Sequence, residues 1–135
     1  MVSAIMVAAI GLSITVSLLL LGLGASRTSF STEQSYQANS LANACAEEAL
    51  VKIYESMIMP DPVPDPVPVL TPYTGNGSLT MGQGTCSYSV TNAGGNTRKI
   101  TSTGTVGTVI RKAQVLTSTL NPVVVSSWKE VADFN

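Results

Sequence analysis

The first 26 residues of the chain contain no charged side chain. The run from Met1 to Ser26 reads MVSAIMVAAIGLSITVSLLLLGLGAS, and Arg27 is the first charged residue. As an α-helix that rises about 1.5 Å per residue, this run would be about 39 Å long, which exceeds the ~30 Å hydrocarbon core of a bilayer. It is also longer than the ~7–15 apolar residues of a secretory signal peptide. The sequence therefore predicts a transmembrane helix over residues 1–26.

Small residues recur at helical spacing within this predicted helix. They are Ala4, Ala8, Gly11, Thr15 and Gly22. In lipid there is no hydrophobic drive between apolar helices, and small residues let helix backbones approach closely enough to pack. The pattern predicts that the helix packs against copies of itself through these residues. The alternative is the ordinary glycine content of a membrane helix.

Residues 27–59 continue as an amphipathic helix. Apolar residues recur every three or four positions, which places them on one helix face. These residues are Ala38, Leu41, Ala42, Cys45, Ala49, Leu50, Ile53 and Met57. Pro60 ends the helix because it lacks a backbone N–H and disfavours helical angles in the residue before it. The helix is therefore expected to span about 1–58 and to bury this stripe in a core.

Residues 60–77 are rich in proline and predict a loop. The repeats Asp61-Pro-Val-Pro and Asp65-Pro-Val-Pro favour an extended polyproline II strut. A proline motif that binds a partner is the alternative. Asn76-Gly77-Ser78 matches a glycosylation acceptor, but such short matches are common by chance, and we interpret these residues as a turn.

The sequence pattern of residues 78–120 predicts a small antiparallel sheet. Cys86, Tyr88 and Val90 alternate with serines, and two runs rich in β-branched residues, 99–106 and 109–119, are separated at Gly107. The tail, 121–135, is either an edge strand or an arm that reaches a neighbouring molecule. The predicted fold class is therefore α+β, with a long N-terminal helix whose C-terminal half packs on an antiparallel β-meander head.

The two cysteines, Cys45 and Cys86, fall on the amphipathic helix and on a predicted strand. An even number of cysteines in a chain with a membrane-crossing start favours a disulfide outside the cytoplasm. Such a bond would join the helix to the sheet. The alternative is a pair of buried free thiols.

Composition argues against catalysis and against nucleic-acid binding. The chain has no histidine, which removes Ser-His and Cys-His nucleophile pairs and the commonest transition-metal ligand. It also has no phosphate-binding loop, no dinucleotide fingerprint and no metal-ligand spacing. The net charge is −1 and the basic residues are scattered, so nucleic acid is not indicated as a partner. We expect no enzyme activity, no cofactor and no metal.

In layout the whole chain resembles a type IV pilin or pilin-like (pseudopilin) subunit. Several short motifs are similar to pilin-like subunits of small-genome bacteria: Ala44-Cys45-Ala46-Glu47-Glu48-Ala49-Leu50, Tyr73-Thr74-Gly75, Gly84-Thr85-Cys86 and Thr103-Gly104-Thr105-Val106-Gly107, followed by Arg111-Lys112. The resemblance implies a helical homopolymer with residues 1–26 in its core, in contact with other pilins and the pilus assembly machinery. It also implies residence in the cytoplasmic membrane before assembly, an extracellular pilus filament afterwards, and processing with N-methylation at Met1.

Two features depart from the pattern of major pilins. Ile5 stands where most of them have a glutamate, and Gly22 stands near a position where a proline is common. Both departures occur among minor, tip and pseudopilin subunits, so a minor pilin that primes assembly or adheres to surfaces is a second hypothesis. A third, from a different class, is a single-span membrane-anchored monomer with a small binding domain.

Overall fold

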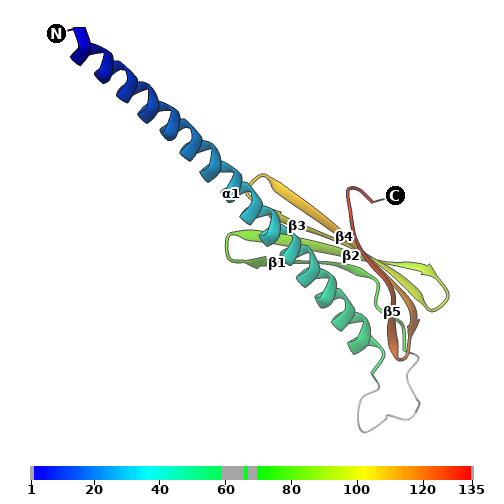
Figure 1. The fold of residues 1–135 in the computed structure, drawn as a ribbon. Helices are drawn as coiled ribbons and strands as arrows, with labels where there is room; N and C mark the ends of the chain where they lie inside the picture. Colours follow the sequence, from blue (N-terminus) through cyan, green and yellow to red (C-terminus); the bar gives the residue numbers. More distant parts are fainter. Residues whose placement is uncertain (1, 59–65, 67–69, 135) are drawn as a thin grey trace. The chain divides into compact units, whose positions relative to one another are not determined.

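The part of the chain that the structure describes folds into one helix followed by five strands (Figure 1). The computed structural model describes residues 2–58, 66 and 70–134, with side chains from residue 20 onward. The elements are α1 (Val2–Ser56), β1 (Gly75–Met81), β2 (Gly84–Gly94), β3 (Thr97–Val106), β4 (Val109–Leu120) and β5 (Val123–Val131). The predicted α+β class is confirmed. The chain divides into two compact units, residues 1–33 and residues 34–135.

Helix α1 ends close to the predicted position, at Ser56. The last turn tightens, because Met57 N donates to Tyr54 O at 3.0 Å and Ile58 N donates to Glu55 O at 3.3 Å. The Ser56 hydroxyl donates to Ile53 O and accepts a 3.0 Å hydrogen bond from Tyr73 N. The chain that returns to the sheet is therefore attached to the end of the helix. The predicted polyproline strut lies mostly outside the described residues.

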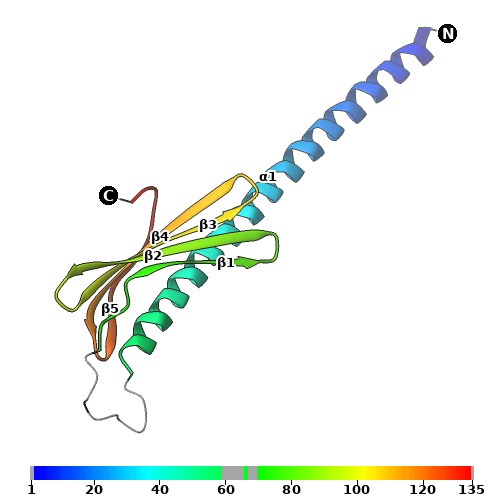
Figure 2. The same cartoon turned by 180° about the vertical axis from the view of Figure 1, so that it is seen from behind.

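The five strands form one antiparallel sheet in the order β1-β2-β3-β4-β5 (Figure 2). The turn glycines Gly82, Gly95 and Gly107 have φ values of 60°, 54° and 59°. Only glycine adopts this left-handed region without a steric cost, which explains the glycines between the predicted strands. The predicted meander is confirmed. The tail forms an edge strand, because β5 pairs with β4 from Lys112 to Leu120.

The boundary between loop and sheet was predicted too late in the chain. Strand β1 begins at Gly75, so the predicted loop 60–77 loses its last three residues, and Asn76-Gly77-Ser78 lies in a strand rather than in a turn. Gly77 is small for a different reason: a Cβ atom there would overlap the ring of Tyr88. The glycine makes room for an aromatic side chain instead of supplying turn geometry.

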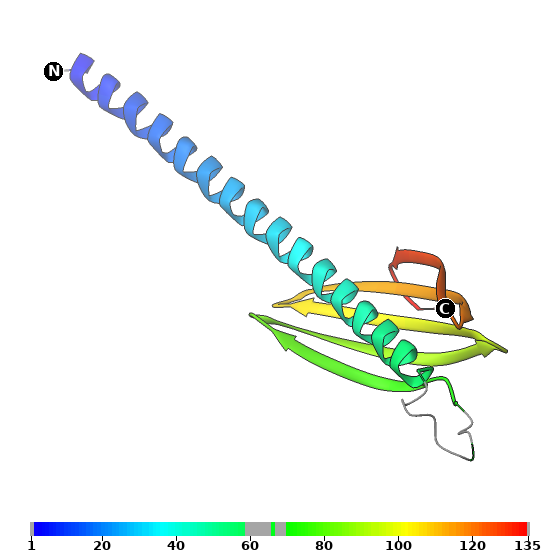
Figure 3. The same cartoon turned by 90° about the horizontal axis from the view of Figure 1, so that it is seen from below.

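Within the second unit, the C-terminal part of α1 lies across one face of the sheet (Figure 3). The helix favours this conformation because alanine, leucine, glutamate and glutamine dominate it, and all are good helix formers. The predicted apolar stripe is confirmed as core, with Leu50 and Met57 half-buried. The fully or nearly fully buried residues of α1 are Ala38, Leu41, Ala42, Cys45, Ala46, Ala49 and Ile53.

The sheet contributes the alternating residues of its central strands to this core. In β3, every second residue from Arg98 to Val106 is buried, and the residues between them are half-buried. Ile100, Val115 and Cys86 are the main apolar contributions from β3, β4 and β2. The helix approaches the sheet closely at Gly104, where a Cβ atom would overlap the Ala38 carbonyl oxygen and the Ala42 nitrogen.

Replacing Gly104 with alanine is expected to destabilise the second unit by about 2–3 kcal/mol, because the added methyl has no space and the helix must move. The matched control is Thr103→Ala on the neighbouring residue, which faces away from the helix and is expected to change stability by less than about 0.5 kcal/mol. Chemical denaturation of the full chain, followed by circular dichroism, measures both. Equal stability of the two variants would contradict the close approach.

Candidate assembly surfaces

The predicted self-packing residues Ala4, Ala8, Gly11 and Thr15 all lie within α1. Their side chains lie outside the described residues, as does Met1, so helix packing and N-terminal processing stay predictions. Gly22 is described, and a Cβ atom there would meet nothing within 4 Å. The fold of the single chain therefore does not require a glycine at this position.

Large apolar side chains are exposed in the first unit. Leu20, Leu21 and Leu23 are 63–71% exposed, and Phe30 is 65% exposed. The hydroxyls of Thr28 and Thr32 donate to the carbonyl oxygens four residues earlier, at 3.0 and 2.9 Å. These two hydroxyl groups therefore have partners within the helix and do not depend on water for them.

In the described part of the chain, no helix meets the length and apolarity that a membrane crossing requires.

The predicted disulfide is present. Cys45 on α1 and Cys86 on β2 are bonded, their Cα atoms are 6.0 Å apart, and both residues are buried. The bond closes a loop with a sequence separation of 41 residues. It therefore fixes the helix to the sheet at the centre of the core.

Removing this bond with the double substitution Cys45→Ala and Cys86→Ala is expected to cost about 4 kcal/mol, because the unfolded chain regains the entropy of a roughly forty-residue loop. The measurement is the free energy of unfolding of the full chain in denaturant. Reductant should have the same effect on the wild type and none on the variant. A cost below about 1 kcal/mol would show that packing alone fixes the helix.

Two tyrosines lie side by side where the sheet meets the helix. Tyr73 lies against Gly75 and Tyr88 lies against Gly77, where a Cβ atom on either glycine would meet the ring. Burial is the main cause that raises the pKa of Tyr88 to about 12, followed by its hydrogen bond with Tyr73 and by the nearby charge of Glu48. The neutral phenol is therefore the form that the fold stabilises.

This raised pKa predicts a loss of stability in base. The folded pKa of Tyr88 lies above its ordinary value of 10.0, so its contribution is complete below pH 10 and is lost as the pH rises toward 12. The free energy of unfolding should fall across this window, and by less in Tyr88→Phe. Tyrosinate absorbance should show one late-titrating group in the wild type that the variant lacks. Identical profiles of stability against pH would contradict the assignment.

The side of α1 that faces away from the sheet forms an exposed stripe. We use the name helix stripe for Glu47, Val51 and Tyr54, which are spaced four and three residues apart and therefore share one face. Val51 is 47% exposed and Tyr54 is 57% exposed. On the flank of the stripe, Lys52 Nζ pairs with Glu55 at 3.2 Å and Glu48 at 3.8 Å. The hydrogen bond to Glu55 and then the two negative charges raise the pKa of Lys52.

The face of the sheet opposite to α1, here called the outer face, is covered by short hydroxyl side chains and lysines. The pairing of the strands places Ser78, Ser87 and Thr103 in one cross-strand row and Thr80, Thr85 and Thr105 in the next. A shallow hollow of about 230 Å³ lies over these two rows. The charged residues on this face of the five strands are Lys99, Lys112 and Lys129.

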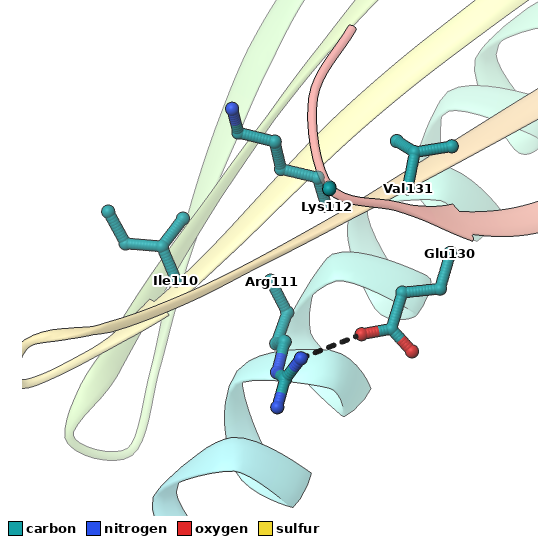
Figure 4. Close-up of a pocket in the computed structure, with 6 residues that line it drawn as sticks. Ile110, Arg111, Lys112, Glu130 and Val131 are labelled. Atoms are coloured by element: carbon teal, nitrogen blue, oxygen red, sulfur yellow. Dashed lines mark hydrogen bonds and ion pairs between the residues drawn. The ribbon is translucent and has the colours of Figure 1, made fainter.

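A second hollow, of about 250 Å³, lies at the end of the sheet formed by β4 and β5 (Figure 4). Ile110, Lys112 and Val131 project on one side of the strands, and Arg111 and Glu130 project on the other (Figure 4). We call the Ile110, Lys112 and Val131 side the notch. Ile110 is 57% exposed, so the notch offers an apolar contact beside a positive charge.

The C-terminal tail of the chain covers the ammonium group of Lys112 in the notch. Asp133 pairs with Lys112 Nζ at 2.7 Å, and the Lys112 nitrogen lies 5.3 Å from the centroid of the Phe134 ring. The hydrogen bond from Lys112, aided by that from Phe134 N, lowers the pKa of Asp133. The sequence did not predict this contact, because an alternation pattern does not reveal where a short tail turns.

Other side chains fix β5 to the helix on the inner side of the sheet. Trp128 Nε1 donates to Asn43 Oδ1 at 3.0 Å, and Arg111 Nε donates to Ser35 Oγ at 3.0 Å. Arg111 also pairs with Glu130 at 3.3 Å. These contacts were not predicted from the sequence. The only pattern that could have indicated them is the strand alternation, which places residues 128 and 130 on the same face.

The described residues contain no group of three or more histidine, cysteine, aspartate or glutamate side chains that could hold a metal ion. The candidate sites among the described residues are therefore surfaces. They are the exposed leucines in the first unit, and the helix stripe and the outer face in the second. Comparison with family models, with curated proteins and with solved structures found no match to this chain.

Proposed function

We propose that this chain is a structural subunit of a type IV pilus-like extracellular filament that polymerises through its apolar N-terminal helix. One observation carries the proposal: a single 55-residue helix contains both an uncharged run and the stripe that a disulfide fixes to a small sheet. The chain therefore combines an apolar segment with a disulfide-bonded folded unit that follows it in the sequence. We infer no chemistry for the subunit beyond packing.

The exposed apolar residues supply a driving force for assembly. Burying a leucine side chain contributes roughly 1.5–3 kcal/mol, and Leu20, Leu21 and Leu23 are available for burial. The hydroxyls of Thr28 and Thr32 already have acceptors within the helix, so moving them away from water costs little. Identical helices packed by a contact that does not close would give a helical filament.

The same features support the location and partners of the proposed subunit. Before assembly the uncharged segment would hold the chain in the cytoplasmic membrane, and afterwards it would line the filament core. The disulfide fits a head that lies outside the cytoplasm. Other pilins and the pilus assembly machinery would be the partners, together with further copies of this chain.

A minor or tip pilin that primes assembly or adhesion is the second candidate. It is favoured by the absence of an acidic residue before Glu33 in the sequence, because most major pilins have a glutamate near the start of this helix. The two roles differ in abundance. Quantitative mass spectrometry of sheared fibres should find this chain as the main component of a major filament and as a trace in the second case.

Enlarging the small residues of the apolar run should block assembly. Ala4→Leu and Gly11→Leu are each expected to reduce filament yield at least tenfold, because close approach between helices is lost. The matched control is Met6→Leu, which nearly conserves volume and should leave the yield unchanged. Electron microscopy and mass spectrometry of sheared cell-surface material measure the yield. Filaments of normal length and number in both enlarged variants would contradict the proposal and favour the membrane-anchored monomer.

A further inference from the structure

The two solvent-facing surfaces of the second unit carry opposite charge. In residues 34–56, α1 has three glutamates and one lysine. On the outer face, the charged residues of the five described strands are the lysines 99, 112 and 129, with no acidic residue among them. The helix side of the unit is therefore acidic and the outer face is basic.

Each surface also has a charge that the fold does not neutralise. Lys52 neutralises part of the charge of Glu48 and Glu55, whereas no ion pair among the described residues involves Glu47. On the outer face Lys112 pairs with Asp133, whereas Lys129 on β5 has no ion-pair partner among the described residues. Glu47 and Lys129 are thus available for a contact with another molecule.

Apolar groups accompany the charges on both surfaces. Val51 and Tyr54 follow Glu47 along the helix stripe, and Ile110 and Val131 are the apolar residues of the notch on the outer face. An aromatic side chain beside an acid on one surface is matched by apolar side chains beside a base on the other. Complementary charge fixes register and partner choice, while the buried apolar and aromatic groups supply affinity.

The two surfaces lie on opposite sides of the sheet, because α1 covers the inner face (Figure 3). One copy therefore cannot use both surfaces on a single partner. A contact between the helix stripe of one copy and the outer face of the next is heterologous. In a pair of copies joined in this way, one copy still has a free outer face and the other still has a free helix stripe. Such a contact propagates into a chain of subunits instead of closing a dimer.

We propose that the helix stripe of one copy docks on the outer sheet face of the next copy, with Glu47 against the lysines and Val51 and Tyr54 over the apolar residues. This inference rests on the proposed filament function. It specifies how the second units, which would be the heads of neighbouring subunits, contact each other. Within the assembly, this surface would set the order of the heads, separately from packing of the apolar run.

Isotope-mixed cross-linking tests the contact directly. Equal amounts of unlabelled and ¹⁵N-labelled full chain are mixed in detergent micelles and treated with a zero-length carboxyl–amine cross-linker. We expect isotope-mixed peptides that join Glu47 to Lys129 or Lys112. Cross-links confined to Lys52 and glutamates of another helix, or no isotope-mixed peptide, would overturn the proposal.

Charge reversal supplies the second test. Glu47→Lys and Lys129→Glu are each expected to weaken self-association at least tenfold in sedimentation experiments on the full chain, and the double variant should recover to within about threefold of wild type. The control is Gln83→Lys, which adds a positive charge in the exposed turn between β1 and β2, outside both surfaces, and should have little effect. A single reversal without effect, or no recovery in the double variant, would overturn the proposal.

The two proposals can fail separately. Filaments on cells that persist in both single reversal variants would overturn the head contact and leave the filament function intact. Isotope-mixed cross-links and charge rescue in a chain that forms no filament would support the contact and refute the filament function.

Discussion

The close approach of α1 to the sheet at Gly104 is the constraint on which the rest of the second unit depends. The helix presents Ala38 and Ala42 at this point, and the strand presents no side chain, so backbone meets backbone. This short separation lets Cys45 reach Cys86 and lets Ile53 and Ile100 fill the remaining core. The disulfide then holds in place an arrangement that small residues make possible.

That approach also decides which surfaces remain for other molecules. Because α1 covers the inner face, the hydroxyl and lysine side chains of the outer face are left to solvent, and so is the far side of the helix. On that far side Val51 and Tyr54 remain exposed beside Glu47. The way the core is closed therefore decides which side chains of the second unit face solvent.

Much of the fold could be predicted from local pattern. The three-to-four spacing from Ala38 to Ile53 identified the buried helix face, and the alternation around Tyr88 identified a strand, because these periods follow directly from helix and strand geometry. The boundary at Gly75 was missed, since the pattern Asn76-Gly77-Ser78 is typical of turns. A glycine selected to fit beside Tyr88 has no local signature, because the ring that requires it lies on another strand.

The sequence by itself determined the order of elements, the uncharged N-terminal run and the lack of histidine, since these depend on residue type and spacing alone. The tertiary structure decided which charges share a face. Lys99, Lys112 and Lys129 lie on three different strands and share one face only through the pairing of β3, β4 and β5. Glu47 is separated from them because helix and outer face lie on opposite sides of one sheet, a relation that only long-range packing creates.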